Sequence, residues 1–385
     1  MMTTINDINR YKSITVNPLL SPDQLFELYS VPSFDNQYPE VVTGKEIGST
    51  KVAVQENDVL ICKINPRINR VWVVKHNTQY PLIASSEWIV VRSPENDSNY
   101  LKWYFSSPQF KNLMVSQVTG IGGSLTRAQP KQVATYPVPL PDFPTQRRIA
   151  NTLDKVAEGI ALCRKMVDEC DLMVKAKFVE MFGDVFDNPK NFEMRLFGDY
   201  ASQMNIGPFG SDLKNDCFVS KENGYCMVYE QKHAIDKNIL VEARYVTEEK
   251  YQQMKRFDIG PGDIIVSCRG TIGKCFILPD DAPHGIIHPS LMMIKPKSTV
   301  NSTFLLFLLE SILKEQQEQG TGVKMAIKAS ELAKIKCIAP PRELQDSYVM
   351  FISQINKSKL TIQGILDKME TEKLALMQAY FNTGI

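Results

Sequence analysis

The feature that most constrains this chain is an internal repeat with an offset of about 205 falling to about 199 residues. Any one pairing is weak, but six pairings occur in the same order along the chain. A tandem duplication explains them. The matched segments, first copy then second, are Glu56–Ile61 with Pro261–Val266, Ile68–Val74 with Ile272–Leu278, Asn99–Phe105 with Thr303–Leu309, Val118–Ile121 with Gly320–Val323, Pro141 and Gln146 with Pro340 and Gln345, and Met181–Phe182 with Tyr380–Phe381.

Each copy has the same predicted plan. Short β-branched runs bounded by polar turns predict a strand-rich globular part. A helical patch follows, around 100–114 and 304–317, and then a glycine-marked loop, Gly120–Ser124 or Gly320–Gly322. A short strand then leads into a proline-rich stop. The predicted domains are globular domains at 1–141 and 187–341, with one long helix after each, at 142–186 and 342–385.

Apolar residues alternate at spacings of four and three after each proline-rich stop. This spacing predicts a coiled-coil seam rather than a broad amphipathic face. Two tandem copies related by a two-fold axis require the helices to pair antiparallel. The predicted fold class is therefore mixed α+β, a duplicated strand-rich domain with two paired helices. The predicted helix-pairing and partner-docking residues are Ile149, Leu153, Val156, Ile160, Val167, Val174, Ile352, Ile355, Ile362, Leu366 and Met369, with Lys359 and Lys373 interrupting the second seam.

Composition excludes several classes of protein. The chain has 385 residues, with 44 Lys and Arg against 43 Asp and Glu, so it is neither a disordered chain nor a strongly basic tail. No apolar run reaches the roughly 20 residues of a membrane span, and the amino terminus lacks a secretory pattern. We therefore expect a cytoplasmic protein without a membrane role, whose eight scattered cysteines stay reduced.

Motifs for catalysis and for metal binding are weak. Gly270–Lys274 resembles part of a phosphate-binding loop, but its spacing is wrong and Cys275 follows it, so a tight turn with an exposed Lys274 is the better interpretation. Cys268, Cys275, His284 and His288 lack zinc-finger spacing. No nucleophile elbow or zinc-protease motif occurs. We expect a binding protein without catalytic residues, metal or cofactor.

Basic residues concentrate in stretches that contain no acidic residue. One stretch lies between Asp58 and Glu87 and another between Asp97 and Asp142. Arg and Lys on such loops can reach phosphates and base edges of DNA, whereas the ordinary alternative is a solvated surface. The predicted DNA-binding residues of these stretches and of the second copy are Lys63, Arg67, Arg70, Arg127, Lys131, Arg269, Lys274, Lys324 and Lys328.

The chain resembles the specificity subunit of type I restriction–modification systems. The resemblance rests on the repeat unit, on Gln146-Arg147-Arg148-Ile149-Ala150 opening a long helix, and on Ala176–Asp184 at the helix end. Phe209-Gly210-Ser211 is similar to the opening loop of many target-recognition domains of that family, which adds Ser211 and the nearby Lys214 as DNA-binding candidates. Two departures stand out: the first copy lacks this loop, and the second helix opens with Gln345-Asp346-Ser347-Tyr348, without the arginines.

The resemblance implies a division of labour. Each target-recognition domain would read one half of a split double-stranded DNA site, and the helices would set the spacing and dock two DNA adenine methyltransferase subunits. Restriction and translocase subunits would join this complex. S-adenosylmethionine, ATP and Mg²⁺ would be held by those partners.

Two other classes of protein remain open. A solitary DNA methyltransferase or nuclease with an embedded recognition domain would need an Asn/Asp-Pro-Pro-aromatic motif or a carboxylate–lysine cluster, and neither is found. A coiled-coil adaptor without a DNA role would leave the basic loops and the duplicated domains without a purpose.

Overall fold

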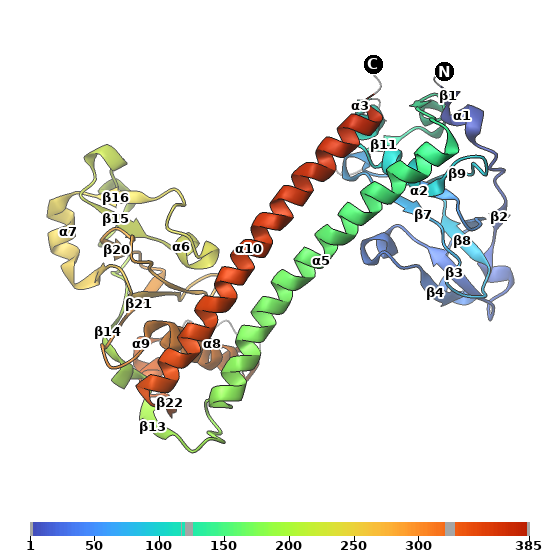
Figure 1. Cartoon of the computed structure of the whole chain (residues 1–385). Coiled ribbons are helices and arrows are strands. Elements are labelled where there is room, and N and C mark those ends of the chain that lie inside the picture. Colours follow the sequence, from blue (N-terminus) through green and yellow to red (C-terminus); the bar gives the residue numbers. More distant parts are fainter. Residues whose placement is uncertain (1–2, 117, 120–125, 320–327, 383–385) are drawn as a thin grey trace. The chain divides into compact units, whose positions relative to one another are not determined.

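The computed structural model describes residues 3–116, 118–119, 126–319 and 328–382. The chain forms two compact units: Met1–Met166 with Thr361–Ile385 is unit 1, and Val167–Leu360 is unit 2. Each unit contains one globular head and one part of each of the two 40-residue helices, α5 (Phe143–Phe182) and α10 (Arg342–Phe381) (Figure 1). The predicted α+β fold class with two long helices is confirmed.

The head of unit 1 is built on a five-stranded sheet, in the order β2-β5-β8-β3-β4, and a three-stranded sheet, in the order β7-β6-β9. Two short antiparallel pairs, β1-β12 and β10-β11, accompany them. The strands are β1 Thr3–Thr4, β2 Thr15–Val16, β3 Leu25–Tyr29, β4 Glu40–Thr43, β5 Lys51–Ala53, β6 Val59–Cys62, β7 Val71–Val73, β8 Leu82–Ser85, β9 Trp88–Val91, β10 Val118–Thr119, β11 Arg127–Ala128 and β12 Pro137–Val138.

Short helices complete this head. They are α1 Ile5–Ile8, α2 Ser98–Phe105, α3 Pro108–Ser116 and α4 Pro130–Val133, with 3₁₀ turns η1 Pro18–Leu20, η2 Pro32–Asn36, η3 Gly44–Glu46 and η4 Pro66–Ile68. The predicted helical patch at 100–114 is two helices instead of one. Pro108 begins the second of them, because proline has no N–H to continue α2 but suits the first turn of a new helix.

The head of unit 2 has a sheet β14-β21-β18-β19, a sheet β16-β15-β20-β17 and the pair β13-β22. The strands are β13 Glu193–Leu196, β14 Ala201–Ile206, β15 Cys226–Tyr229, β16 Arg244–Val246, β17 Asp258–Ile259, β18 Ile264–Ser267, β19 Cys275–Ile277, β20 Gly285–Ile287, β21 Leu291–Pro296 and β22 Lys336–Ala339. The helices are α6 Gln231–Asp236, α7 Glu248–Met254, α8 Ser302–Gln319 and α9 Ala329–Leu332, with η5 Phe197–Tyr200, η6 Asn215–Cys217, η7 Lys221–Asn223 and η8 Lys255–Phe257.

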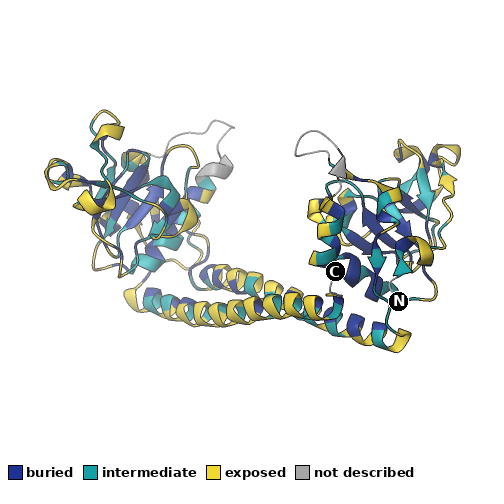
Figure 2. Cartoon of the chain, turned by 90° about the horizontal axis from the view of Figure 1, so that it is seen from above, coloured by how far each residue is buried: buried dark blue, intermediate teal, exposed yellow. Residues whose placement is uncertain are grey.

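The two heads have matching strand pairings, which bears out the predicted duplication. β3 pairs parallel with β8, so that Tyr29 faces Ala84, and β15 pairs parallel with β20, so that Tyr229 faces Ile287. β6 and β18 each lie between two antiparallel neighbours. Both of these strands are apolar and buried on both faces, as an unbroken apolar run predicts. Figure 2 shows buried residues gathered in the sheets of each head.

The central strand of each head separates two cores. On β6, Val59 and Ile61 pack with the residues of α2 and α3, whereas Leu60 packs with Tyr29 and Trp72. β18 divides its neighbours in the same way, because side chains alternate between the two faces of a strand. The sheet that contains β6 or β18 is thus packed on both of its faces.

One strand of unit 2 has no counterpart among the described residues of unit 1. β14 lies at the edge of its sheet beside β21 and leads into the Gly207-Pro208-Phe209-Gly210-Ser211 loop. In unit 1 the Asn9 side chain occupies the edge of β9, where it donates to Val90 O at 2.9 Å and accepts from Arg92 N at 2.9 Å. The first copy has no sequence match to the Gly207–Ser211 loop, and its described residues form no edge strand equivalent to β14.

A buried glutamine joins each head to the start of its long helix. Gln146 accepts from the backbone N–H of Asp97 at 2.9 Å and donates to Pro141 O at 2.9 Å. Gln345 accepts from the backbone N–H of Asn301 at 3.0 Å and donates to Pro340 O at 2.9 Å. The two repeat-matched glutamines thus make the same pair of bonds.

The end of each long helix lies in the head of the other copy of the repeat. In unit 2, Phe182 of α5 packs against Phe304, with ring centroids 4.9 Å apart. In unit 1, Phe381 of α10 packs against Tyr100, with ring centroids 5.6 Å apart. The matched residues Phe182 and Phe381 therefore perform the same task, and each unit contains an antiparallel α5–α10 pair.

None of the eleven predicted seam residues is exposed. Leu153 is 0% and Ile149 is 5% exposed, and both belong to the core of unit 1 together with Phe381. Val174 and Ile352 belong to the core of unit 2, against which Ile355 packs. The remaining six are buried or half-buried, namely Val156, Ile160, Val167, Ile362, Leu366 and Met369.

The two lysines that interrupt the second seam have partners. Lys359 Nζ lies 2.6 Å from Asp171 Oδ1 in unit 2. In unit 1, Lys373 Nζ lies 5.1 Å from the ring centroid of Trp103, a cation–π arrangement. Among the helices that the structure describes, none combines the length and the apolar character needed to cross a bilayer.

Candidate nucleic-acid interface

Three predicted cations of unit 1 lie around the connection between β6 and β7. The segment Thr126–Ala128 runs beside this connection, because Asn65 N donates to Thr126 O at 2.9 Å and Ala128 N donates to Lys63 O at 2.9 Å. Arg127 therefore lies close to Lys63 and to η4, which carries Arg67. The fold brings together residues that stand about 60 positions apart in the sequence.

Glu87 lies within this group and neutralises part of it. Arg127 Nη2 donates to Glu87 Oε1 at 3.2 Å, and Lys63 Nζ lies 3.8 Å from Glu87 Oε2. Arg70 Nε lies 3.7 Å from Asp35 Oδ1. Stretches that are acid-free in sequence are thus not acid-free in space, since carboxylates arrive from other strands and turns.

Among the predicted DNA-binding residues of unit 1, Arg67 and Lys131 are exposed and have no carboxylate partner among the described residues. Arg67 lies in η4, which is flanked by Asn65 and Asn69 in the left-handed region, at φ of 46° and 55°. Asparagine tolerates that conformation better than most residues do. The short turn therefore carries Arg67 on a defined backbone.

In unit 2, the β18–β19 turn presents Arg269 and Lys274, both exposed. This segment is the tight turn that the sequence predicted in place of a phosphate-binding loop. Gly273 N donates to Ser267 O at 2.8 Å, and Lys274 N donates to Ser267 Oγ at 2.9 Å, so the base of the turn is closed. Gly270 and Gly273 have φ of 68° and 83°, a conformation that favours glycine.

The loop after β14 carries Ser211 and Lys214, and both are exposed. Its first glycine is required by a close approach, because a Cβ on Gly207 would lie 2.3 Å from His288 O. Phe209 is 74% exposed, which is unusual for a side chain of its size. Ser211 Oγ donates to Asp212 Oδ1 at 3.3 Å.

The remaining candidates concern the glycine-marked loops. Lys328 is exposed and its Nζ lies 2.8 Å from Glu331 Oε1. Lys324 and both loops, Gly120–Ser124 and Gly320–Gly322, lie outside the described residues. Arg127 and Lys328 each follow one of these loops within a few residues in the sequence.

Sequence reasoning missed two residues that shape these surfaces. Gln231, in the first turn of α6, donates from Nε2 to Arg269 O at 2.7 Å and to Thr271 O at 3.0 Å. Glu27 of β3 is 0% exposed and accepts from Asn77 Nδ2 at 2.8 Å and from Thr78 N at 2.8 Å, which holds the loop after β7 in place. A charged residue inside an otherwise apolar strand was the available signal for Glu27; Gln231 had none.

The pKa of Glu27 reflects two opposing influences. Burial alone would raise the pKa of this carboxyl, but the hydrogen bonds from the side chains and backbone of Asn77 and Thr78 outweigh it, so the pKa is lowered from its ordinary value. Glu27 is therefore a carboxylate at neutral pH. It fixes Asn77 and Thr78 through these hydrogen bonds.

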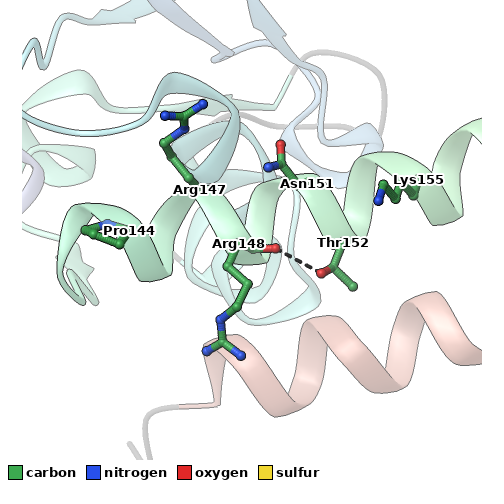
Figure 3. A pocket seen from close by; sticks show the side chains of 6 residues that line it. All are labelled: Pro144, Arg147, Arg148, Asn151, Thr152 and Lys155. Carbon is green, nitrogen blue, oxygen red and sulfur yellow. Dashed lines mark hydrogen bonds between the residues drawn. The ribbon is translucent and has the colours of Figure 1, made fainter.

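A shallow hollow lies on the first turns of α5. Its lining residues are Pro144, Arg147, Arg148, Asn151, Thr152 and Lys155 (Figure 3). Arg147 and Arg148 point away from each other, and Thr152 Oγ1 donates to Arg148 O at 2.9 Å. This helix start thus presents basic side chains on more than one side.

The start of α10 offers a different surface. Gln146 and Gln345 align the helices, so Arg147 corresponds to Asp346, whose Oδ1 accepts from Asn301 Nδ2 and Arg342 Nε, both at 2.9 Å. Met350, which corresponds to Asn151, is 65% exposed. The two helix starts are therefore equivalent in backbone connection but not in chemistry.

Comparisons with solved structures found several chains that are similar to this one. A chain from a structure concerned with complex assembly and conformational transition of the type I R-M system matches with a TM-score of 0.68 at 16% identity, covering 100% of this chain and 98% of that chain. This likeness shows a shared fold. The HsdS subunit from Thermoanaerobacter tengcongensis matches with a TM-score of 0.48 at 17% identity, over 100% of this chain and 97% of that one. The type I S subunit from M. genitalium matches with a TM-score of 0.49 at 13% identity, over 98% and 95%.

The sequence itself matches a family profile. The profile is that of the type I restriction modification DNA specificity domain, and it covers residues 215–371, which include most of the second head and much of α10. This match confirms the resemblance drawn from the repeat and the helix motifs. Residues 215–371 of this chain are thus similar in sequence to the type I restriction modification DNA specificity domain.

Proposed function

We propose that this protein is the DNA specificity subunit of a type I restriction–modification complex, and that each head reads one half of a bipartite double-stranded DNA site. The observation that carries the proposal is the duplicated head, in which matching sheets support loops with exposed cations. Exposed Arg and Lys on loops are the groups that contact phosphates and guanine edges. The family profile over the second head supports the same role.

The long helices have a separate role in this proposal. They set the spacing between the half-sites and provide docking surfaces for two DNA adenine methyltransferase subunits, with restriction and translocase subunits joining the assembly. Methyl transfer from S-adenosylmethionine and ATP-driven steps with Mg²⁺ belong to those partners. The support is that each helix has one end in each unit, so that its length couples the two heads.

The first experiment identifies the site. The chain is co-expressed with its adenine methyltransferase, the complex is purified, and methylated adenines are mapped on genomic DNA. The proposal expects methylation at a two-part sequence with a fixed gap, on opposite strands. Methylation at a continuous site, or none in a complex that has formed, would contradict it.

The second experiment tests the spacing role. A deletion starting at Leu153 is unsuitable, because Leu153 is fully buried in the core of unit 1. Matched removal of residues 163–169 from α5 and 361–367 from α10 leaves the Gly159–Met369 contact of unit 1 and the Asp171–Lys359 pair of unit 2 intact. Seven residues correspond to about 10 Å of helix, or about three base pairs.

The double deletion should shorten the gap in the methylated site by about three base pairs. Removal of 163–169 alone is the control, and it should impair folding because it shifts the register of one helix against the other. A doubly deleted protein that folds and methylates the original spacing would refute the spacing role while leaving DNA recognition by the heads unaffected.

A further inference from the structure

The side chain of Gln231 holds the β18–β19 turn of unit 2 from outside the turn. Gln231 Nε2 donates to Arg269 O at 2.7 Å and to Thr271 O at 3.0 Å. These two carbonyls lie on either side of Gly270, so that one amide group spans the tip of the turn. The base of the turn is closed separately by Ser267.

Gln231 and Gly270 fit each other closely. A Cβ at Gly270 would lie 3.3 Å from Gln231 Nε2, and the φ of 68° already disfavours any other residue. A primary amide has two N–H groups, and both are used here by backbone carbonyls. Gln231 therefore has no N–H left for a base edge, and only its Oε1 remains as an acceptor.

The equivalent position of unit 1 cannot act in this way. The matching parallel ladders, Tyr29 with Ala84 and Tyr229 with Ile287, align Gln231 with Val31. The side chain of valine has no hydrogen-bond donor. In unit 1 the corresponding β6–β7 connection contains η4 instead, and Lys63 Nζ donates to Ser86 O at 2.7 Å.

We propose that Gln231 is a positioning residue for DNA recognition by the second head: it holds the Arg269–Thr271 turn in one conformation and so orients the exposed Arg269 toward a base edge or phosphate. The inference rests on the proposed function. A long flexible cation gains discrimination when its backbone is fixed in advance, because less freedom is lost on binding. Gln231 acts through Arg269 and does not itself contact DNA.

The test is a double-mutant cycle with the full complex and a duplex that carries the mapped bipartite site. Arg269→Ala should weaken binding by on the order of tenfold. Gln231→Met keeps the length of the side chain but removes both hydrogen bonds, and it should weaken binding by about threefold to tenfold. In the Arg269→Ala background, Gln231→Met should have almost no further effect.

Gln203→Ala is the matched control, since it also removes a glutamine bond to a backbone carbonyl in the same head, from Nε2 to Arg256 O at 3.0 Å. It should leave binding unchanged, and thermal unfolding of the Arg269→Ala, Gln231→Met and Gln203→Ala variants should remain similar. Gly270→Ala should resemble Gln231→Met, because it disturbs the same contact from the other side.

The outcomes separate the two proposals. If Arg269→Ala binds as tightly as the parent protein, this turn does not contact DNA, and the assignment of Arg269 under the proposed function fails. If Arg269→Ala weakens binding but Gln231→Met does not, only the positioning role fails. If the two losses multiply, Gln231 acts independently of Arg269 and the inference is overturned.

Discussion

Phe381, near the carboxyl end of the chain, lies with its ring centroid 5.6 Å from that of Tyr100 in the first head. It is 1% exposed and also packs edge-on against Tyr104 at 5.6 Å. The last turn of α10 is therefore part of the core of unit 1, although more than half of the chain separates the two elements in sequence. Removal of the Phe381 side chain would therefore disturb the first head rather than the second.

Phe381→Ala should destabilise unit 1 by about 3–5 kcal/mol, since it removes a fully buried aromatic ring. The three tryptophans are Trp72, Trp88 and Trp103, and all lie in unit 1, so tryptophan fluorescence during urea unfolding reports on this unit. Phe182→Ala removes the matching ring from unit 2. It should lower the midpoint followed by circular dichroism but not the midpoint followed by fluorescence.

Gln146→Met should destabilise unit 1 by about 1–3 kcal/mol, because the backbone N–H of Asp97 and the Pro141 carbonyl, both in half-buried residues, would lose their buried partner. Gln345→Met should do the same in unit 2. Each effect is measured by urea unfolding, with the half-buried Gln203 as the control position in the variant Gln203→Ala. Equal stability of the parent and the Gln146→Met variant would show that the buried bonds contribute nothing net.

Glu27 predicts a pH dependence of stability. Its pKa in the folded protein is lowered below the ordinary value of 4.5, so the unfolded chain binds its proton more readily than the folded chain does. The stabilisation is present above about pH 4.5 and is lost as the pH falls through the lowered pKa. Fluorescence-detected unfolding between neutral pH and pH 3 should show this loss.

Glu27→Gln is the test variant for that dependence. It should be less stable at neutral pH, because an amide nitrogen would face donors, and it should lose less stability on acidification than the parent protein. Glu46→Gln is a control: the pKa of Glu46 is also lowered, by hydrogen bonds from Thr43, but its carboxylate is exposed. A parallel pH profile for parent and Glu27→Gln would exclude the buried carboxylate as the cause.

Glu87→Gln should strengthen DNA binding by the first head. The neutral amide keeps an acceptor for Arg127 but removes the charge that neutralises Lys63 and Arg127. We expect higher affinity at low salt and a salt dependence steeper by about one released counterion. Binding to the mapped duplex over a range of salt concentrations measures both effects; weaker binding would place this cluster away from the DNA.

Much of the architecture could be predicted because its signals are local or repeated. The seam period of α5 and α10 depends on residues three and four positions apart, and the apolar strands β6 and β18 depend on adjacent residues. The β18–β19 turn followed from its glycines. The split between α2 and α3 was missed, although Pro108 marked it, because the apolar pattern on either side continues.

The candidate site was less predictable because its properties depend on residues that meet only after folding. Lys63 and Arg127 stand in acid-free stretches, yet both approach Glu87. Gln231 reaches a turn 38 positions away in the sequence. Neither contact produces a periodic pattern in the sequence from which it could be predicted.

The sequence by itself determined that this protein is a duplicated unit of a strand-rich head and a long helix, since a repeat preserves the order of its elements whatever their packing. Only the tertiary structure decided that the ends of α5 and α10 complete the opposite copy's head, and which cations keep their charge unpaired. Burial and Coulomb interactions act between neighbours in space, and those neighbours come from distant parts of the chain.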